Sequence, residues 1–119
     1  MPSDTPTAPS GAPSHLELGV PDAASSRTFF VGLFGWSDRP MPHESFYATT
    51  PTVGVGLHGH DDDRAIVVYF AVDDIDRAVE RVRALGGTSD DPGPPIEGFG
   101  RFAECRDPQG VRFGLHQRR

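Results

Sequence analysis

His15-Leu-Glu-Leu-Gly-Val-Pro-Asp22 and Val67-Val-Tyr-Phe-Ala-Val-Asp-Asp74 are two versions of one segment, and the architecture follows from this duplication. The two segments superimpose when the sequence is shifted along itself. Near the end of each copy, Val55-Gly-Leu-His58 falls in the same way on Phe113-Gly-Leu-His116. An internal repeat of this kind indicates a fold built from two copies of one structural unit.

Each copy predicts the order strand, helix, strand, strand, strand. The first strand alternates, with Leu16, Leu18 and Val20 on one face. A helix follows, since apolar residues such as Ile75 and Val79 recur at helical spacing. Shorter strands are expected at about Ser45–Thr49, Val53–His58, Arg101–Arg106 and Val111–His116, with further strands starting near Trp36 and Thr88. We therefore predict an α+β fold in which two β-α-β-β-β modules form a curved mixed sheet, with the helices outside.

The domain boundaries come from composition. At 119 residues the chain has room for one domain with one modest core. Residues 1–13 are rich in Pro, Ser and Thr, and we predict that they form a disordered leader. A single domain is expected over residues 14–118, with module 1 at about residues 14–60 and module 2 at about residues 65–118.

Charge and cysteine content exclude several classes of partner. The net charge of −6 comes without a basic stripe, so neither nucleic acid nor an anionic membrane surface is expected to bind. The longest apolar run, Ala65 to Val72, is too short to span a bilayer. The lone Cys105 cannot form an internal disulfide, which favours a cytoplasmic protein, and we interpret it as a small strand residue.

The second face of each strand indicates a binding cup between the two modules. That face mixes polar, aromatic and glycine residues, which suits a cleft better than a dry core. We expect the ligand to pack on Tyr69, Trp36 and Phe46, because glycines at Gly56 and Gly114 leave space beside them. The full set of expected ligand-binding residues is His15, Glu17, Trp36, Phe46, Gly56, His58, Tyr69, Arg101, Glu104, Gly114 and His116.

Several further motifs extend over most of the chain. They are Phe29-Phe-Val-Gly-Leu-Phe-Gly-Trp36, Ala84-Leu-Gly-Gly87, Gly100-Arg-Phe-Ala103 and Asp107-Pro-Gln-Gly-Val-Arg-Phe-Gly-Leu115. With these motifs the sequence resembles the vicinal oxygen chelate superfamily of glyoxalases, bleomycin-resistance proteins and extradiol dioxygenases. It looks most like the small actinobacterial glyoxalase-like proteins. The resemblance implies a glyoxalase-like fold and a homodimer.

The resemblance also implies where a divalent metal would be held. The four positions fall on His15, Val67, Gly56 and Gly114, and only the first of these residues can coordinate an ion. We therefore expect no metal cofactor at these positions. A displaced site at His15, His58 and His116 is the alternative, because three imidazoles suit zinc or iron.

Three functions remain open. The first is a metal-free module that binds a small organic molecule. The second is an enzyme of the superfamily, such as a lyase, isomerase, cyclase or dioxygenase, with Glu17 or His15 as general base or with the relocated metal. Burial would raise the pKa of the Glu17 carboxyl for such a role, whereas pairing with Arg101 or Arg112 would leave it inert. The third is a dimerisation or interaction domain, and we rank the binding module first.

Overall fold

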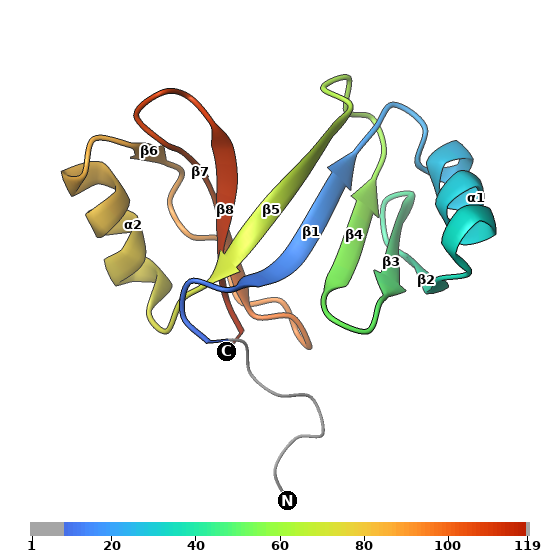
Figure 1. Cartoon of the computed structure of the whole chain (residues 1–119), viewed down its shortest axis with the longest axis horizontal. Helices are drawn as coiled ribbons and strands as arrows, with labels where there is room; N and C mark the ends of the chain where they lie inside the picture. Colours follow the sequence, from blue (N-terminus) through green and yellow to red (C-terminus); the bar gives the residue numbers. More distant parts are fainter. Residues whose placement is uncertain (1–8, 119) are drawn as a thin grey trace, which may run out of the picture. The chain divides into compact units, whose positions relative to one another are not determined.

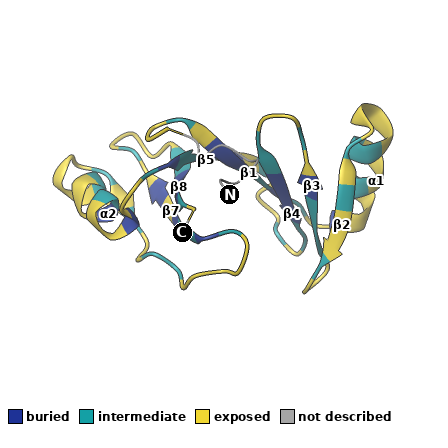
Figure 2. Ribbon diagram, turned by 90° about the horizontal axis from the view of Figure 1, so that it is seen from below, coloured by how far each residue is buried: buried dark blue, intermediate teal, exposed yellow. Residues whose placement is uncertain are grey.

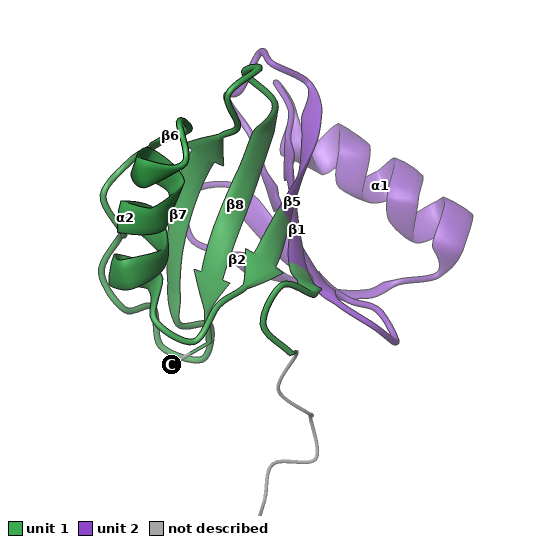
Figure 3. Ribbon diagram, turned by 60° about the vertical axis from the view of Figure 1, so that its left-hand side comes forward, with its two compact units in different colours: residues 1–14, 69–119 green, residues 15–68 purple. Residues whose placement is uncertain are grey.

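The computed structural model describes residues 9–118, which form two helices and eight strands (Figure 1). The chain divides into two compact units (Figure 3). Unit 2 contains residues 15–68, and unit 1 contains the rest of the described chain, on both sides of unit 2 in the sequence. The predicted cup between the two modules remains a prediction.

Unit 2 contains the first copy of the repeat. Its elements are β1 (Pro13–Gly19), which begins just before the unit boundary, α1 (Ala23–Phe34), β2 (Ser37–Met41), β3 (Ser45–Thr49) and β4 (Gly54–His58). The strands lie in the order β2-β3-β4-β1. β1 and β4 are parallel, whereas the other neighbouring pairs are antiparallel.

Unit 1 repeats this arrangement with the second copy. Its elements are β5 (Ala65–Ala71), which begins in unit 2, α2 (Ile75–Ala84), β6 (Thr88–Ser89), β7 (Arg101–Arg106) and β8 (Arg112–Gln117). The order is β5-β8-β7-β6, again with the first and last strands of the copy parallel. The predicted α+β class with two β-α-β-β-β modules and mixed strand pairing is therefore confirmed.

The helices begin and end at residues suited to those places. The side chains of Asp22 and Asp74 accept hydrogen bonds from backbone N–H groups in the first turns of α1 and α2. Gly35 ends α1 with φ of 69°, a left-handed conformation that glycine adopts without steric cost.

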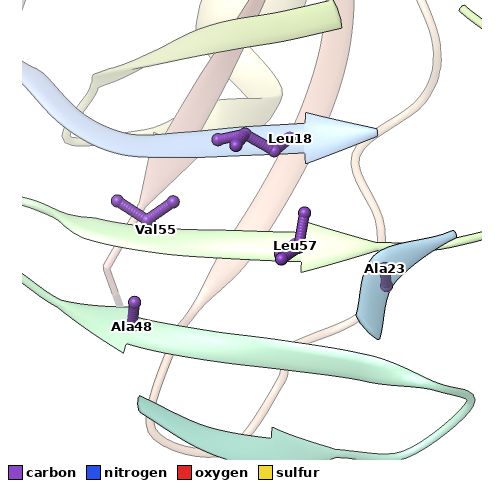
Figure 4. Close-up of a cluster of buried hydrophobic side chains, with 5 residues drawn as sticks. All are labelled: Leu18, Ala23, Ala48, Val55 and Leu57. Carbon is purple, nitrogen blue, oxygen red and sulfur yellow. The ribbon is translucent and has the colours of Figure 1, made fainter. Parts of the chain in front are cut away.

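Each unit has its own hydrophobic core between its helix and its strands. In unit 2, α1 packs against β3 and β4, and five buried side chains form the cluster in Figure 4: Leu18, Ala23, Ala48, Val55 and Leu57. In unit 1, α2 packs against β6, β7 and β8 around Ile75, Val79, Ala103, Cys105 and Leu115. Figure 2 shows that most buried positions lie on the strands, whereas both helices are largely exposed or intermediate. The strand face that carries Leu16, Leu18 and Val20 packs in the core of unit 2, as the alternating pattern predicts.

The predicted leader needs a correction at its end. Residues 1–8 lie outside the described part of the chain, but Gly11 and Ala12 exchange backbone hydrogen bonds with Ala71, and β1 begins at Pro13. These backbone pairs give residues 11–13 a fixed place in unit 1, which their Pro- and Gly-rich composition does not reveal. Among residues 9–118, neither helix has the length and apolar character needed to cross a bilayer.

Replacing Ile75 by Ala tests the core of unit 1. Ile75 is fully buried, so the cavity left by Ile75→Ala should destabilise the protein by about 2–5 kcal/mol in urea unfolding. Ile96→Ala is the matched control, because Ile96 is half exposed and its truncation should cost less than about 1 kcal/mol of stability. Equal losses in the two variants would contradict this core.

Candidate functional site

A chain of four ionisable side chains in unit 2 forms the candidate site. His15 Nε2 lies 2.9 Å from Glu17 Oε1, and the other carboxylate oxygen, Oε2, lies 2.6 Å from His58 Nδ1. The opposite ring nitrogen of His58 lies 2.9 Å from Asp61 Oδ2. Glu17 is thus shared by two imidazoles, and His58 is shared by two carboxylates.

Strand pairing brings these residues together. The parallel register places Glu17 beside Gly56 and His58 beside Gly19, so side chains of β1 and β4 meet on one face. A Cβ atom at Gly56 would collide with the Glu17 carboxylate, and one at Gly19 would collide with Asp61. These glycines therefore accommodate the side chains of the site.

This finding corrects the expectation that the glycines leave space for a bulky ligand. A Cβ at Gly54 would meet the Tyr47 phenol, and one at Gly114 would meet the Tyr69 ring. Together with Gly56, each of these glycines lies beneath a side chain of a neighbouring strand. The sequence shows the small residue but does not show which neighbour covers it.

Tyr47 and Arg39 extend the same face of unit 2. Tyr47 lies opposite Gly56 and Arg39 opposite Tyr47, so both are in one row with Glu17 across the four strands. The Tyr47 ring is nearly parallel to the His15 ring at 6.4 Å, and the Arg39 guanidinium lies 5.6 Å from the Tyr47 centroid. Sequence reasoning missed these two residues and Asp61. Strand alternation could have identified Tyr47, since it immediately follows the core-facing Phe46.

The local charges and hydrogen bonds favour the ionised forms of Glu17 and His58. Burial alone would raise the pKa of the Glu17 carboxyl, but hydrogen bonds and charges from His15 and His58 outweigh burial and lower it. Burial would lower the pKa of the His58 imidazole, but Glu17 and Asp61 outweigh this effect and raise it. The expectation that the pKa of Glu17 is raised overall is therefore wrong, although burial acts in that direction. The raised pKa of His58 favours its imidazolium form, which can donate a proton.

Arg101 and Arg112, the alternative partners considered for Glu17, pair with other carboxylates. Arg101 pairs with Asp76 at the start of α2, and Arg112 pairs with Glu104 at 3.0 Å. Arg101 therefore extends toward the helix of unit 1, on the face that also carries the buried Ala103. The two histidines provide the hydrogen bonds to Glu17 instead.

In unit 1 the expected site residues are engaged with one another. The buried Tyr69 packs edge-on against Phe102, whose ring is stacked on His116 at 4.5 Å. His116 also uses both ring nitrogens, with Nδ1 2.8 Å from Ser14 Oγ and Nε2 2.6 Å from the Phe99 carbonyl oxygen. Glu104 lies opposite Gly114 in the pairing of β7 with β8.

The three aromatic residues expected to pack on the ligand, Tyr69, Trp36 and Phe46, do not form one surface. Trp36 and Phe46 pack against the core cluster of unit 2, under α1, beside a small apolar pocket lined also by Leu18 and Leu57. They therefore do not share the face that carries Glu17, and the expectation for Phe46 is wrong by one position along β3. Cys105 is buried and burial raises the pKa of its thiol, in agreement with its interpretation as a small strand residue.

The residues at the metal positions do not fit a divalent ion. Among residues 9–118, no three His, Cys, Asp or Glu side chains are grouped so as to hold a metal. For the displaced set, both ring nitrogens of His58 and of His116 are within hydrogen-bond distance of protein partners, so coordination would require these bonds to break.

A sequence profile of the Glyoxalase/Bleomycin resistance protein/Dioxygenase superfamily matches residues 12–115. The chain belongs to this superfamily. The match covers both copies of the repeat, and the resemblance noted from the sequence motifs is thereby confirmed.

Relatives of this superfamily domain include two groups of curated actinobacterial proteins. The chain is 33% identical to the anthracycline biosynthesis protein DnrV of Streptomyces peucetius over 88% of its length, which is 46% of that protein. It is 29% identical to the putative glyoxylase CFP32 of Mycobacterium bovis, over 90% of this chain and 46% of that one. The chain thus spans about half the length of the curated relatives it matches.

Known structures share the fold of this superfamily domain. A hypothetical protein from Bacillus halodurans matches with a TM-score of 0.69 at 16% identity, over 93% of this chain and 96% of that one. Methylmalonyl-CoA epimerase from Streptomyces coelicolor matches with a TM-score of 0.64 at 15% identity, over 92% of this chain and 98% of that one. An extradiol ring-cleaving dioxygenase from B. fuscum matches with a TM-score of 0.66 at 20% identity, over 95% of this chain and 35% of that one.

The site predicts a pH-dependent contribution of His58 to stability. Because its folded-state pKa is raised above 6.5, the imidazolium should stabilise the fold fully below that pH, and the contribution should disappear as the pH rises through the folded pKa. At acid pH this stabilisation has a lower limit that is set by Glu17. Because the folded-state pKa of Glu17 is lowered, the stability that its carboxylate contributes is lost as the pH falls through that pKa.

The contribution is measured as the difference in free energy of unfolding in urea between wild type and His58→Gln, from pH 4 to pH 9. We expect the largest difference at about pH 5–6.5. The half-exposed ring limits the difference to less than about 1 kcal/mol. His60→Gln is the matched control, because it makes the same substitution at an exposed histidine that pairs with Glu44, outside the candidate site. A difference between His58→Gln and wild type that grows above pH 7 would contradict the assigned charges.

Proposed function

We propose that this superfamily domain binds a small organic molecule at the face of unit 2 that carries Glu17. The observation that supports the proposal is that Glu17 stays ionised between two histidines while 26% of its side chain remains exposed. A carboxylate held in place and still accessible can accept a hydrogen bond from a ligand O–H or N–H group at little cost in side-chain entropy.

The neighbouring side chains support a ligand with a flat, partly apolar body. Tyr47 provides an aromatic ring on the same face, and Arg39 provides a cation beside that ring. Aromatic rings with a few fixed polar groups are typical of small-molecule sites. The name of the Streptomyces relative, an anthracycline biosynthesis protein, makes anthracyclines the first class to test.

We also propose that binding needs no resident divalent metal. The support is chemical, because Val67, Gly56 and Gly114 provide no side-chain donor atom at three of the four positions that the superfamily resemblance implies. Both oxygens of the Glu17 carboxylate contact imidazoles, those of His15 and His58, so the protein itself provides hydrogen-bond partners for this carboxylate.

Native mass spectrometry of protein purified without a His tag, with and without added doxorubicin, tests both proposals. We expect an organic adduct that survives EDTA and that is weakened about tenfold in Glu17→Gln, since a hydrogen bond to a charged group contributes about 1.5–3 kcal/mol. The exposed Glu80→Gln on α2 is the matched control and should keep the adduct. A metal adduct that EDTA removes together with the ligand, or the absence of any organic adduct, would contradict the proposals.

An acid–base enzyme is the second candidate, and the His58–Glu17–His15 chain is the observation that favours it. Groups joined by hydrogen bonds of 2.6 Å and 2.9 Å can donate a proton at one end and accept one at the other. His58, with its raised pKa, would be the acid, and Glu17 would orient the two rings. An isomerase or lyase that moves a proton on its substrate would use this arrangement.

Deuterium exchange separates the two functions. Wild-type protein is incubated in D2O with a bound molecule identified by mass spectrometry, and the molecule is then recovered. An enzyme of this kind should introduce deuterium at a carbon position, at a rate reduced by about 10²-fold or more in His58→Gln. Recovery of the unlabelled molecule from wild type would leave binding alone as the function.

We further propose that the chain forms a homodimer, as the resemblance implies. The support is that the curated relatives are about twice as long, so that in them a segment of similar length accompanies the part that matches this domain. A cytoplasmic location remains a prediction that is based on the single cysteine.

A further inference from the structure

Helix α1 exposes an unusual amount of apolar surface. Phe29, Leu33 and Phe34 are 61%, 59% and 58% exposed. Of the twelve residues in α1, only Ala23 is fully buried. The exposed residues on the outer side of α1 carry no charge and form what we call the α1 apolar face: Ala24, Ser25, Thr28, Phe29, Gly32 and Leu33. Phe34 is exposed at the end of the helix, next to this face. An exposed apolar surface of this kind is typical of an interaction site.

Helix α2 provides an internal comparison. It occupies the same place in the second copy of the repeat, but its exposed residues are mostly charged: Asp76, Arg77, Glu80, Arg81 and Arg83. The fold therefore does not require an apolar outer helix face. The difference between the two copies indicates a role that only α1 has.

The α1 apolar face is held in place by rings beneath it. Phe30 lies edge-on to Phe29 at 5.1 Å, and Trp36 is stacked on both Phe30 and Phe34 at 5.6 Å and 5.2 Å. Side chains fixed in this way lose little further entropy when a partner covers them. At Gly32 a Cβ atom would meet nothing within 4 Å, so a partner can approach the backbone there.

We propose that two copies of this chain associate through the α1 apolar face, with α1 of one copy packed on α1 of the other about a twofold axis. The inference rests on the proposed homodimer and names its surface, and it is independent of the ligand. Charge favours a second copy as the occupant. Each copy carries a net charge of −6, and an uncharged face is where two such copies can meet without direct like-charge contacts.

Sedimentation velocity over a range of protein concentrations tests the assignment. Wild type should be dimeric, and Phe29→Glu and Leu33→Glu should each raise the dimer dissociation constant at least about tenfold, because each places two like charges at the contact. The matched controls are Leu85→Glu and Val111→Glu, which introduce the same charge at exposed apolar residues outside the α1 apolar face and should leave the dimer unchanged. Circular dichroism checks that all four variants are folded.

A cysteine introduced at Gly32 provides a second measurement. Near a twofold axis each residue lies close to its own copy, so Gly32→Cys should form an intermolecular disulfide under mild oxidation. Arg81→Cys, on the exposed side of α2, should not, and the buried Cys105 should stay unreacted.

The outcomes separate the two proposals. A wild-type chain that stays monomeric at all concentrations would overturn both the homodimer and its surface. A dimer that persists in Phe29→Glu and Leu33→Glu, or that is lost equally in the Leu85→Glu control, would overturn the α1 assignment alone.

Discussion

The parallel pairing of the first and last strands of each copy organises the protein. In unit 2 it places β1 beside β4, so that Glu17 lies next to Gly56 and the imidazoles of His15 and His58 reach the two oxygens of one carboxylate. In unit 1 the same pairing of β5 with β8 places the Tyr69 ring over Gly114. One backbone rule therefore yields two different environments, an ionised group in one copy and a packed aromatic group in the other.

The fold was predictable because its determinants are local or repeated. Strands Ser45–Thr49 and Arg101–Arg106 occur at the predicted bounds, and Asp22 and Gly35 begin and end α1 through interactions within a turn of the chain. The N-terminal boundary of the domain was harder to predict from the sequence. The hydrogen bonds of Gly11 and Ala12 to Ala71 join segments far apart in the sequence, and composition alone carries no information about such pairs.

The site was predictable only in part. Glu17, His15 and His58 were identified from the face that they share, but their direct contacts depend on the relative register of β1 and β4. The direction of the Glu17 pKa depends on whether burial or hydrogen bonding is stronger, and only the observed partners decide that balance. Phe46 was assigned to the wrong face because a one-residue change in strand parity reverses a side chain, which placed Tyr47 outside the prediction.

The histidines on either side of Glu17 favour its carboxylate form, and we propose that this carboxylate binds a ligand group without a metal. The most direct measurement is the titration of the Glu17 side-chain carboxyl by ¹³C NMR in metal-free protein. We expect a pKa below the ordinary value of 4.5 in wild type and a rise toward that value in His58→Gln. A pKa at or above 4.5 in wild type, unchanged by His58→Gln, would contradict this expectation.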